Sequence, residues 1–185
     1  MAILHVNNHK VADAKMLDRM LKNIGLNDTD ALEQLYNTCS SSVYAYALSL
    51  IKNPDEAKDV MHDAFLSIYK NANTYNSVGK PMAWILMITK NLCFMRLREL
   101  KKQASFGDDY LNNTCHILDG SAEDKILIEN CINNLDEIDR QIVVLHAVSG
   151  FKHREIASFL GIPLSTVLSK YSRATAKLKN YLKEI

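Results

Sequence analysis

Two short amphipathic segments near the C-terminus flank a glycine and a proline, and this arrangement restricts the fold more than any other feature of the chain. Ile156 and Leu160 repeat at helical spacing and predict the buried face of a first helix. Gly161 follows where a left-handed residue commonly ends a helix, and Pro163 cannot continue that helix. The pattern predicts a helix-turn-helix whose second helix covers residues 165–176.

The predicted second helix begins at Ser165 or Thr166, either of which can accept a hydrogen bond from the unpaired N–H groups of a helix N-terminus. Val167 and Tyr171 face the first helix by periodicity. The opposite face carries hydroxyl groups and cations, which can contact phosphates and base edges in the major groove of DNA. We therefore favour a DNA-binding motif over an ordinary helical hairpin, which the local pattern also allows.

Helical periodicity extends over almost all of the 185-residue chain, and proline and glycine are scarce. Runs of alternating β-branched residues are absent, so the predicted fold class is all-α. The polar, turn-prone residues 105–121 predict a flexible linker between two small helical domains at 29–104 and 122–185. Residues 1–28 form an N-terminal extension with one weak amphipathic segment, to which we can assign no role.

Prolines predict the starts of two helices in the first domain. Pro54 follows a predicted break at Asn53 and precedes Asp55, whose carboxylate is favourable near the positive end of a helix. Pro81 opens the next helix, which ends in a cationic segment. Within that helix Trp84 has helical spacing from other apolar residues, and we favour a core position over a platform for stacking bases.

The net charge of +1 conceals a strong segregation of charge. From residue 140 to the end there are eight cations and two carboxylates, and from 90 to 102 there are five cations and one carboxylate. Residues 108–139 carry nine carboxylates and one lysine. Two basic patches separated by an acidic segment favour two DNA-facing surfaces, although charge alone allows solvated helix faces equally well.

Signatures of enzymes are missing, and we expect no catalytic residue, cofactor or metal site. The four cysteines, Cys39, Cys93, Cys115 and Cys131, are far apart and fit thiols in a reducing compartment. Cys115 adjoins His116, where a plain loop thiol is a better interpretation than a metal or redox site. No apolar run is long enough for a membrane span or a signal peptide, so the expected location is cytoplasmic.

Four segments, in order along the chain, are similar to segments of one protein family. They are residues 53–65 (NPDEAKDVMHDAF), 81–91 (PMAWILMITKN), 135–145 (LDEIDRQIVVL) and 150–157 (GFKHREIA). With these motifs, residues 29–104 and 122–182 resemble the extracytoplasmic-function (ECF) group of bacterial RNA polymerase sigma factors, which keeps only regions 2 and 4. The resemblance implies a region 2-like domain at 29–104 and a region 4-like domain at 122–185.

The resemblance also implies three sets of contact residues. The set for core RNA polymerase is Asp55, Asp59, His62, Asp63 and Phe65. The set for the −10 promoter element is Tyr75, Asn76, Ser77, Lys80, Trp84, Lys90, Asn91, Arg96, Arg98, Lys101 and Lys102. The set for the −35 promoter element is Arg154, Ser165, Thr166, Leu168, Ser169, Lys170, Arg173 and Lys177.

Several positions depart from the family pattern. His62 stands where glutamine is usual, Ser165 replaces a glycine, and Leu168 replaces a cation. Ser172 lies where a larger residue is frequent, and Thr175 replaces the last arginine of the motif. These departures predict a weaker or unusual preference at the −35 element.

The expected function is that of a specificity subunit that binds core RNA polymerase, recognises promoter DNA and directs transcription initiation. Two exposed domain faces and a linker would also permit an anti-sigma factor. A LuxR-type DNA-binding regulator is one alternative, although it would not explain residues 54–102. A sigma-like protein that binds polymerase but no longer recognises promoters is a second alternative. An enzyme is the least favoured alternative.

Overall fold

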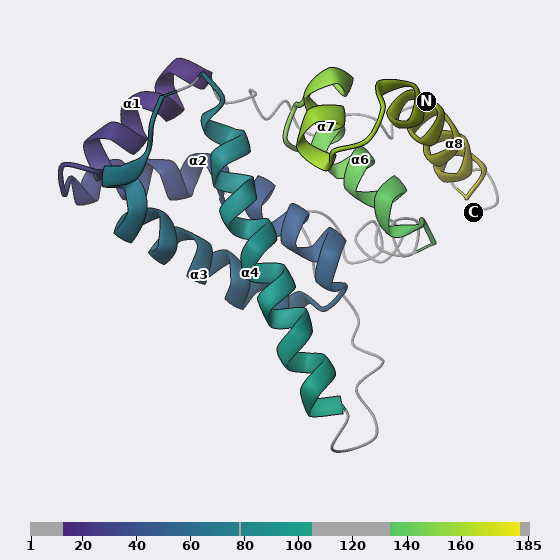
Figure 1. Cartoon of the computed structure of the whole chain (residues 1–185), viewed down its shortest axis with the longest axis horizontal. Helices are drawn as coiled ribbons and strands as arrows, with labels where there is room; N and C mark the ends of the chain where they lie inside the picture. Colours follow the sequence, from purple (N-terminus) through teal and green to yellow (C-terminus); the bar gives the residue numbers. More distant parts are fainter. Residues whose placement is uncertain (1–12, 78, 105–133, 182–185) are drawn as a thin grey trace.

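The computed structural model describes residues 13–77, 79–104 and 134–181, and these residues form helices joined by short turns. The elements are α1 (Ala14–Ile24), α2 (Thr29–Ile51), α3 (Pro54–Asn71), the short 3₁₀-helix η1 (Ala72–Thr74), α4 (Pro81–Ala104), α6 (Glu137–Ala147), α7 (His153–Leu160) and α8 (Leu164–Tyr181). Helices α1 to α4 form an N-terminal half, and α6 to α8 form a C-terminal half (Figure 1). The predicted all-α fold is confirmed, whereas the predicted linker lies outside the described residues.

The breaks between α2, α3 and α4 lie where proline predicts them. Lys52 adopts a left-handed conformation with φ 61° and ends α2. The Asn53 side chain then accepts a hydrogen bond from Glu56 N at 3.1 Å, and Pro54 is the first residue of α3. Pro81 likewise begins α4. Both predicted helix starts are confirmed.

Helix α1, for which the sequence suggested no role, shares the core of the N-terminal half. Four of its apolar side chains, Leu17, Met20, Leu21 and Ile24, are buried. At its end Gly25 lies against the backbone of Ala72, where an added Cβ would be 3.0 Å from the Ala72 carbonyl oxygen. This close approach fixes the end of α1 beside η1, directly before the segment that leads into α4.

The C-terminal half contains the predicted helix-turn-helix. Helix α7 ends at Gly161, which is left-handed with φ 69°, and α8 begins at Leu164. The prediction that Ser165 or Thr166 precedes and caps α8 is wrong, because the Pro163 carbonyl already accepts the Val167 N–H at 3.1 Å. Both residues therefore lie in the first turn. Val167 is fully buried, as its spacing predicts.

The two halves contact each other along α2 and α6, which lie side by side (Figure 1). The Tyr46 hydroxyl donates to Gln141 Oε1 at 3.3 Å, and both side chains are buried. The Tyr46 ring also meets the Phe159 ring edge to face, with centroids 5.7 Å apart. The contact therefore joins α2 both to α6 and to the first helix of the helix-turn-helix.

Candidate nucleic-acid and protein interfaces

The exposed face of α3 is acidic. Asp55, Asp59, His62 and Asp63 are all exposed on this helix, as expected for a protein-binding surface. Phe65, which the sequence placed in the same set, is only 5% exposed and packs against Tyr36 with ring centroids 4.8 Å apart. The structure therefore corrects the expectation for Phe65, because its position in the helical repeat faces the core.

A groove of about 360 Å³ separates the acidic face of α3 from α4. Its lining includes Asp59, His62 and Asp63 from α3, and Met95 and Arg96 from α4. Met95 is 53% exposed, which is unusual for so large an apolar side chain. The groove thus combines carboxylates with an accessible apolar surface.

Two exposed apolar residues on α3 were missed by the sequence reasoning. Leu66 is 55% exposed, and Tyr69 is also exposed. Leu66 directly follows Phe65, so the helical repeat that turns Phe65 inward turns Leu66 outward. These two residues add exposed apolar area in the C-terminal half of α3.

The segment between η1 and α4 is anchored at Tyr75. The Tyr75 ring packs against Trp84, with centroids 5.0 Å apart and planes at 59°. Its hydroxyl donates to Asp18 of α1 at 2.9 Å, and burial raises the Tyr75 pKa to about 12. Trp84 is half-buried and packs against the core, in line with the preferred interpretation. Asn76 and Ser77 are exposed beside this pair.

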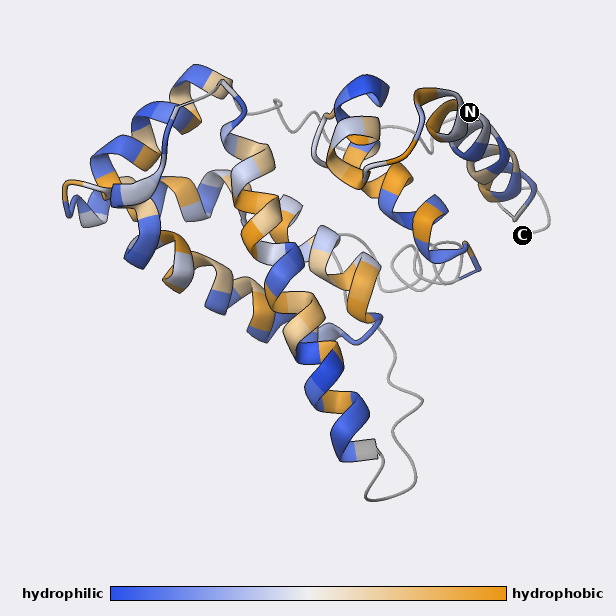
Figure 2. Ribbon diagram, viewed as in Figure 1, coloured by the Kyte–Doolittle hydropathy of each residue, from blue (hydrophilic) through white to orange (hydrophobic). Residues whose placement is uncertain are grey.

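Cations lie along the second half of α4, and the last turns of this helix are mostly hydrophilic (Figure 2). Arg98, Lys101 and Lys102 are exposed, and so is Asn91. Arg96 differs, because its guanidinium is paired with Glu56 of α3 and also lies 3.4 Å from Glu99. The Glu56 hydrogen bond raises the Arg96 pKa further. Arg96 therefore joins α3 to α4 in this arrangement.

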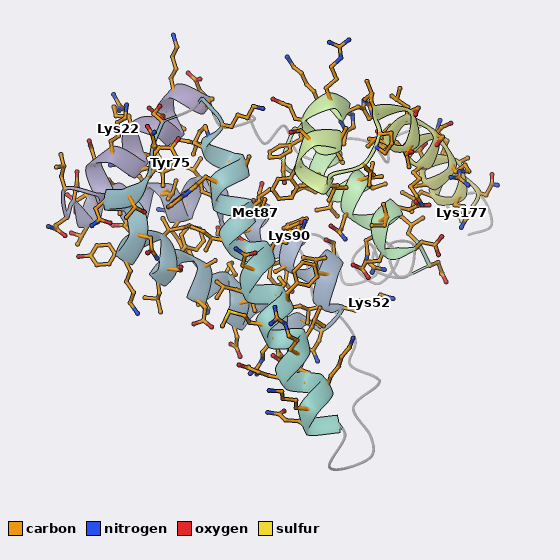
Figure 3. All side chains as sticks on the ribbon, in the orientation of Figure 1. Lys22, Lys52, Tyr75, Met87, Lys90 and Lys177 are labelled. Atoms are coloured by element: carbon orange, nitrogen blue, oxygen red, sulfur yellow. The ribbon has the colours of Figure 1, made fainter. Side chains whose placement is uncertain are left out.

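Lys90 faces the C-terminal half from the middle of α4 (Figure 3). Its ammonium nitrogen lies 5.5 Å from the centroid of the Phe159 ring and 6.0 Å from that of Phe94. Both distances are within the range of a cation–π interaction. Lys90 is thus directed at α7 rather than at open solvent.

Helix α8 presents a polar face to solvent. The exposed side chains on this helix from the expected −35 set are Ser165, Leu168, Ser169, Arg173 and Lys177, and Thr166 is half-buried. On α7, Arg154 is also exposed.

Lys170 is the exception on α8. Its ammonium nitrogen lies 2.7 Å from an oxygen of Asp139, a buried carboxylate on α6. This pair attaches α8 to α6, so Lys170 has a structural partner that the sequence did not reveal.

Two stacked histidines lie against α8 and were also missed. The His146 and His153 rings have centroids 4.5 Å apart and planes at 25°, and each meets Tyr171 edge on. His146 Nδ1 lies 2.8 Å from the Phe151 carbonyl oxygen. His153 Nε2 is buried without a hydrogen-bond partner among the described residues. Burial, followed by the proximity of His146, lowers the His153 pKa.

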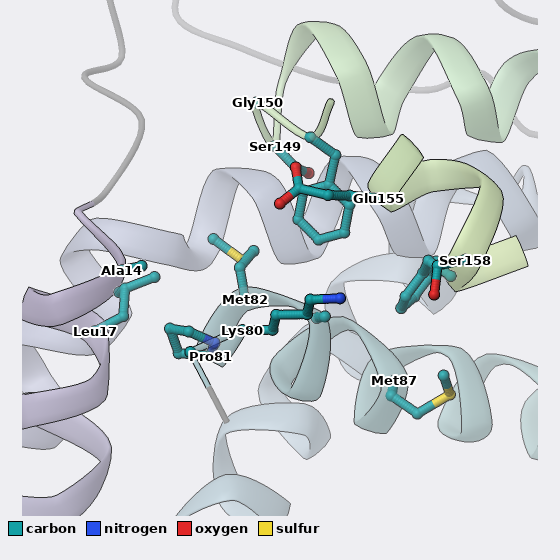
Figure 4. A pocket seen from close by; sticks show the side chains of 14 residues that line it. Ala14, Leu17, Lys80, Pro81, Met82, Met87, Ser149, Gly150, Glu155 and Ser158 are labelled. Atoms are coloured by element: carbon teal, nitrogen blue, oxygen red, sulfur yellow. The ribbon is translucent and has the colours of Figure 1, made fainter. Parts of the chain in front are cut away.

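A cleft of about 310 Å³ lies between the two halves (Figure 4). One wall comes from α1 and the start of α4, and the other comes from the turn between α6 and α7 and from α7 itself. Figure 4 shows Lys80 extending from the first wall toward the α7 wall, which carries Ser158. Glu155 lines the same cleft, so its polar groups come from both halves.

Within the described parts of the chain, no helix is both long and apolar enough to cross a membrane. The same residues contain no group of three or more side chains that could hold a metal ion. Cys39 and Cys93 are buried free thiols, and burial raises the pKa of each to about 12. Cys115 and Cys131, and with them the Cys115–His116 pair, lie outside the described residues.

Two solved structures have similar folds. The sigma factor RpoE in complex with the anti-sigma factor NepR from Bartonella quintana matches with a TM-score of 0.70 and 22% identity, over 82% of this chain and 96% of that chain. The structure of CnrH in complex with the cytosolic domain of CnrY matches with a TM-score of 0.61 and 19% identity, over 91% of this chain and 98% of that chain.

Sequence comparison gives matches along most of the chain. The ECF RNA polymerase sigma factor SigK of Mycobacterium sp. (strain KMS) is 23% identical over 178 residues, covering 90% of each protein. SigK of Mycobacterium tuberculosis (strain Erdman) is 21% identical over 174 residues, covering 90% of this chain and 93% of that protein. The family model of sigma-70 region 2 matches residues 35–103, and that of sigma-70 region 4 matches residues 125–178. The two models together match more than half of the chain, which therefore belongs to the sigma-70 family of RNA polymerase sigma factors, in its ECF group.

Proposed function

We propose that this sigma factor binds core RNA polymerase through α3, contacts the −10 element with its N-terminal half and the −35 element with α8, and so directs transcription initiation. One observation carries the proposal: an acidic helix face, an anchored loop before a cationic helix, and an exposed helix-turn-helix follow one another in the chain. Core polymerase supplies the chemistry, so we assign no enzymatic activity, cofactor or metal. We place the protein in the cytoplasm, where core polymerase and promoter DNA are found.

The α3 surface suits a basic partner. Asp55, Asp59 and Asp63 are exposed along it, and opposite charges across an interface speed association and select partners. Leu66 and Met95 add exposed apolar area, which charged contacts alone do not provide. We infer that a basic helix of core polymerase lies in the α3–α4 groove.

Opening of the −10 element requires cations for phosphates and a site for a base that has left the stack. Arg98, Lys101 and Lys102 are exposed at the end of α4 and suit the phosphates. Asn76 lies at the other end of α4, in the segment anchored by Tyr75, and its side chain has no hydrogen-bond partner among the described residues. An amide offers both donors and acceptors to the edge of a base.

Recognition of the −35 element is proposed for the exposed face of α8, because a recognition helix of this length fits the major groove. Arg173 is exposed and suits a guanine edge or a phosphate. Leu168 is 48% exposed on this helix, where an apolar side chain can contact a thymine methyl group.

The compact arrangement of the two halves cannot reach both promoter elements at once. The elements lie roughly 25 base pairs apart, or about 85 Å along B-form DNA. A compact chain of this length has a radius of gyration of only about 16 Å. We therefore infer that the α2–α6 contact opens when the sigma factor binds polymerase and promoter DNA together.

An anti-sigma factor is the second partner that we propose. The RpoE structure with a similar fold is a complex with the anti-sigma factor NepR. In this chain, the cleft between the halves has a volume of about 310 Å³ and is lined by both of them. A protein segment bound there would keep the halves together and keep Lys90 directed at α7.

The proposed function is tested by adding the protein to core polymerase and transcribing fragments of the source genome. Sequencing of the 5′ ends should reveal start sites that core polymerase alone does not use, preceded by two shared sequence elements. Binding to DNA without a complex with core polymerase would favour the LuxR-type regulator. A complex with core polymerase that produces no new start sites would favour a sigma-like interaction protein.

A further inference from the structure

The segment from Tyr75 to Ser77 is attached to the protein by few side chains. Its backbone is fixed at one end, where Tyr75 N donates to the Ala72 carbonyl at 3.1 Å. Asn76 and Ser77 are exposed, whereas Tyr75 is half-buried. The conformation of this segment therefore depends strongly on what the Tyr75 side chain contacts.

Tyr75 is held from two sides, and one of them is α1. Trp84 of α4 packs against the ring, and Asp18 of α1 accepts the hydrogen bond from the hydroxyl at 2.9 Å. Figure 3 shows Tyr75 beneath α1, close to α4. The ring contact fixes the depth of the side chain, and the hydrogen bond fixes the direction of its hydroxyl end.

Asp18 is itself well placed to act as an anchor. Its side chain is only 17% exposed and pairs with Lys22, one turn later in α1, at 3.0 Å. Hydrogen bonding from Ser77, then from Lys22 and Tyr75, keeps the Asp18 pKa below its ordinary value of 3.8. The carboxylate is therefore charged at neutral pH and accepts the hydrogen bond that holds Tyr75 at the start of the segment.

We infer that Asp18 is a positioning residue for promoter recognition, which orients the Tyr75–Ser77 segment so that Asn76 meets the unpaired base of the opened −10 element. This inference rests on the proposed function, because Asn76 has a base to contact only if this loop reads the −10 element. Asp18 lies before residue 35, where the match to sigma-70 region 2 begins. Through Asp18, the N-terminal helix α1 would contribute to the sequence specificity of −10 recognition.

The test uses holoenzyme reconstituted from core polymerase and binding of single-stranded −10 oligonucleotides that carry each of the four bases at each position. The measured quantity is the ratio of Kd values for the worst and the best base. Asp18→Ala should lower this ratio by about fivefold at one position, since a good base contact provides about 1–3 kcal/mol of discrimination. Asp18→Asn retains an oxygen that can accept the Tyr75 hydrogen bond and should retain most of the ratio.

Two further variants separate positioning from simple destabilisation. Asp13 caps α1 through Lys15 N at 3.1 Å and has no hydrogen bond to Tyr75, Asn76 or Ser77, so Asp13→Ala should weaken the same helix and leave the ratio unchanged. Tyr75→Phe removes the other partner of the hydrogen bond. Combined with Asp18→Ala, it should reduce the ratio no further than either change does alone.

Each outcome has a distinct meaning. Unchanged discrimination in Asp18→Ala, with wild-type holoenzyme discriminating normally, would overturn the positioning role and leave the proposed function intact. An equal loss in Asp13→Ala would also overturn it, because stability of α1 would then explain the effect. Wild-type holoenzyme without any base preference would refute −10 reading by this loop and the role of Asp18 with it.

Discussion

Arg140 of α6 donates from Nε to the main-chain carbonyl of Ser49 in α2, at 2.6 Å. The same guanidinium donates from Nη1 to the Leu135 carbonyl at 3.0 Å, and the residue is only 2% exposed. Ser49 lies in the last turn of α2, where the helix dipole favours a cation. No carboxylate among the described residues lies within ion-pair distance, and burial lowers the Arg140 pKa. The contact between the halves is thus built around a buried cation.

Arg140→Ala should separate the two halves, because it removes the hydrogen bond that joins α6 to the end of α2. Small-angle X-ray scattering should show a larger radius of gyration for this variant. The loss of partners for two buried carbonyls should also cost about 1–3 kcal/mol of stability. Arg154→Ala removes an exposed arginine and is the matched control. An unchanged radius in Arg140→Ala would mean that Arg140 is not needed for the contact.

Asp59→Arg should weaken binding to core polymerase by about 1–3 kcal/mol, because it places a cation against a basic partner. Thermal stability should change little, since Asp59 is exposed on α3. Binding is measured by titration of labelled protein with core polymerase. Glu33→Arg makes the same change of charge on α2, outside the groove, and should bind normally. Equal affinities of wild type and Asp59→Arg for core polymerase would show that this face of α3 is not part of the interface.

Removal of Arg98 and Lys102 together should weaken promoter complexes of any sequence. Each phosphate contact contributes roughly −0.7 to −0.9 to the slope of log K against log salt concentration, so the slope of the double variant should be less steep by about one to two. Arg96→Ala should behave differently, because Arg96 is paired with Glu56 and its loss should mainly loosen α3 from α4. An unaltered salt slope in the double variant would identify this helix end as solvated surface.

The structure separates the two cations of the recognition helix. Arg173→Ala should impair transcription that depends on the −35 element and should leave stability nearly unchanged, because the side chain is exposed. Lys170→Ala should lower stability by about 1–3 kcal/mol, because it leaves the buried Asp139 carboxylate without its partner. Thermal unfolding and transcription are measured for both variants. If Arg173→Ala lowered stability and Lys170→Ala impaired only transcription, the roles of the two residues would be the reverse of those assigned here.

The stability of the C-terminal half should decrease as the pH falls below about 6.5. The His153 pKa is lowered in the folded protein, so the unfolded chain binds the proton more tightly and folding opposes protonation. The stabilisation is present above the unfolded pKa of His153 and is lost as the pH falls through the folded pKa. His146 stacks on the ring, Tyr171 meets its edge, and Glu155 lies two residues later. Unfolding midpoints of wild type and His153→Phe between about pH 5 and about pH 7.5 test this, and parallel profiles would contradict it.

Local signals in the sequence were sufficient for the starts of α3 and α4 and for the end of α7. Pro54, Pro81 and Gly161 each act on their own part of the backbone, and all three stand where a helix begins or ends. The cap expected at Ser165 or Thr166 lies two or three residues too late, because the Pro163 carbonyl accepts the first hydrogen bond of α8. Such competition between neighbouring residues is not visible in residue preferences alone.

Contacts between distant residues could not be predicted from the sequence. Asp18 meets Tyr75, Asp139 meets Lys170, and Arg140 meets Ser49, and none of these pairs follows a helical or sequence repeat. The sequence also gives no sign of whether a cationic side chain is buried or paired in the folded protein. The expected DNA-contact sets therefore mixed exposed side chains with residues that have internal partners, such as Lys170 and Lys90.

Sequence-specific initiation is tested most directly by run-off transcription from one promoter found by 5′-end mapping, with both elements intact or with either one scrambled. We expect core polymerase to produce the specific transcript only when this protein is present. Scrambling either element should reduce the transcript at least about tenfold, because each mismatched base pair costs about 1–3 kcal/mol. Equal amounts of transcript from the intact and scrambled promoters would contradict the assignment of this chain as a promoter-reading sigma factor.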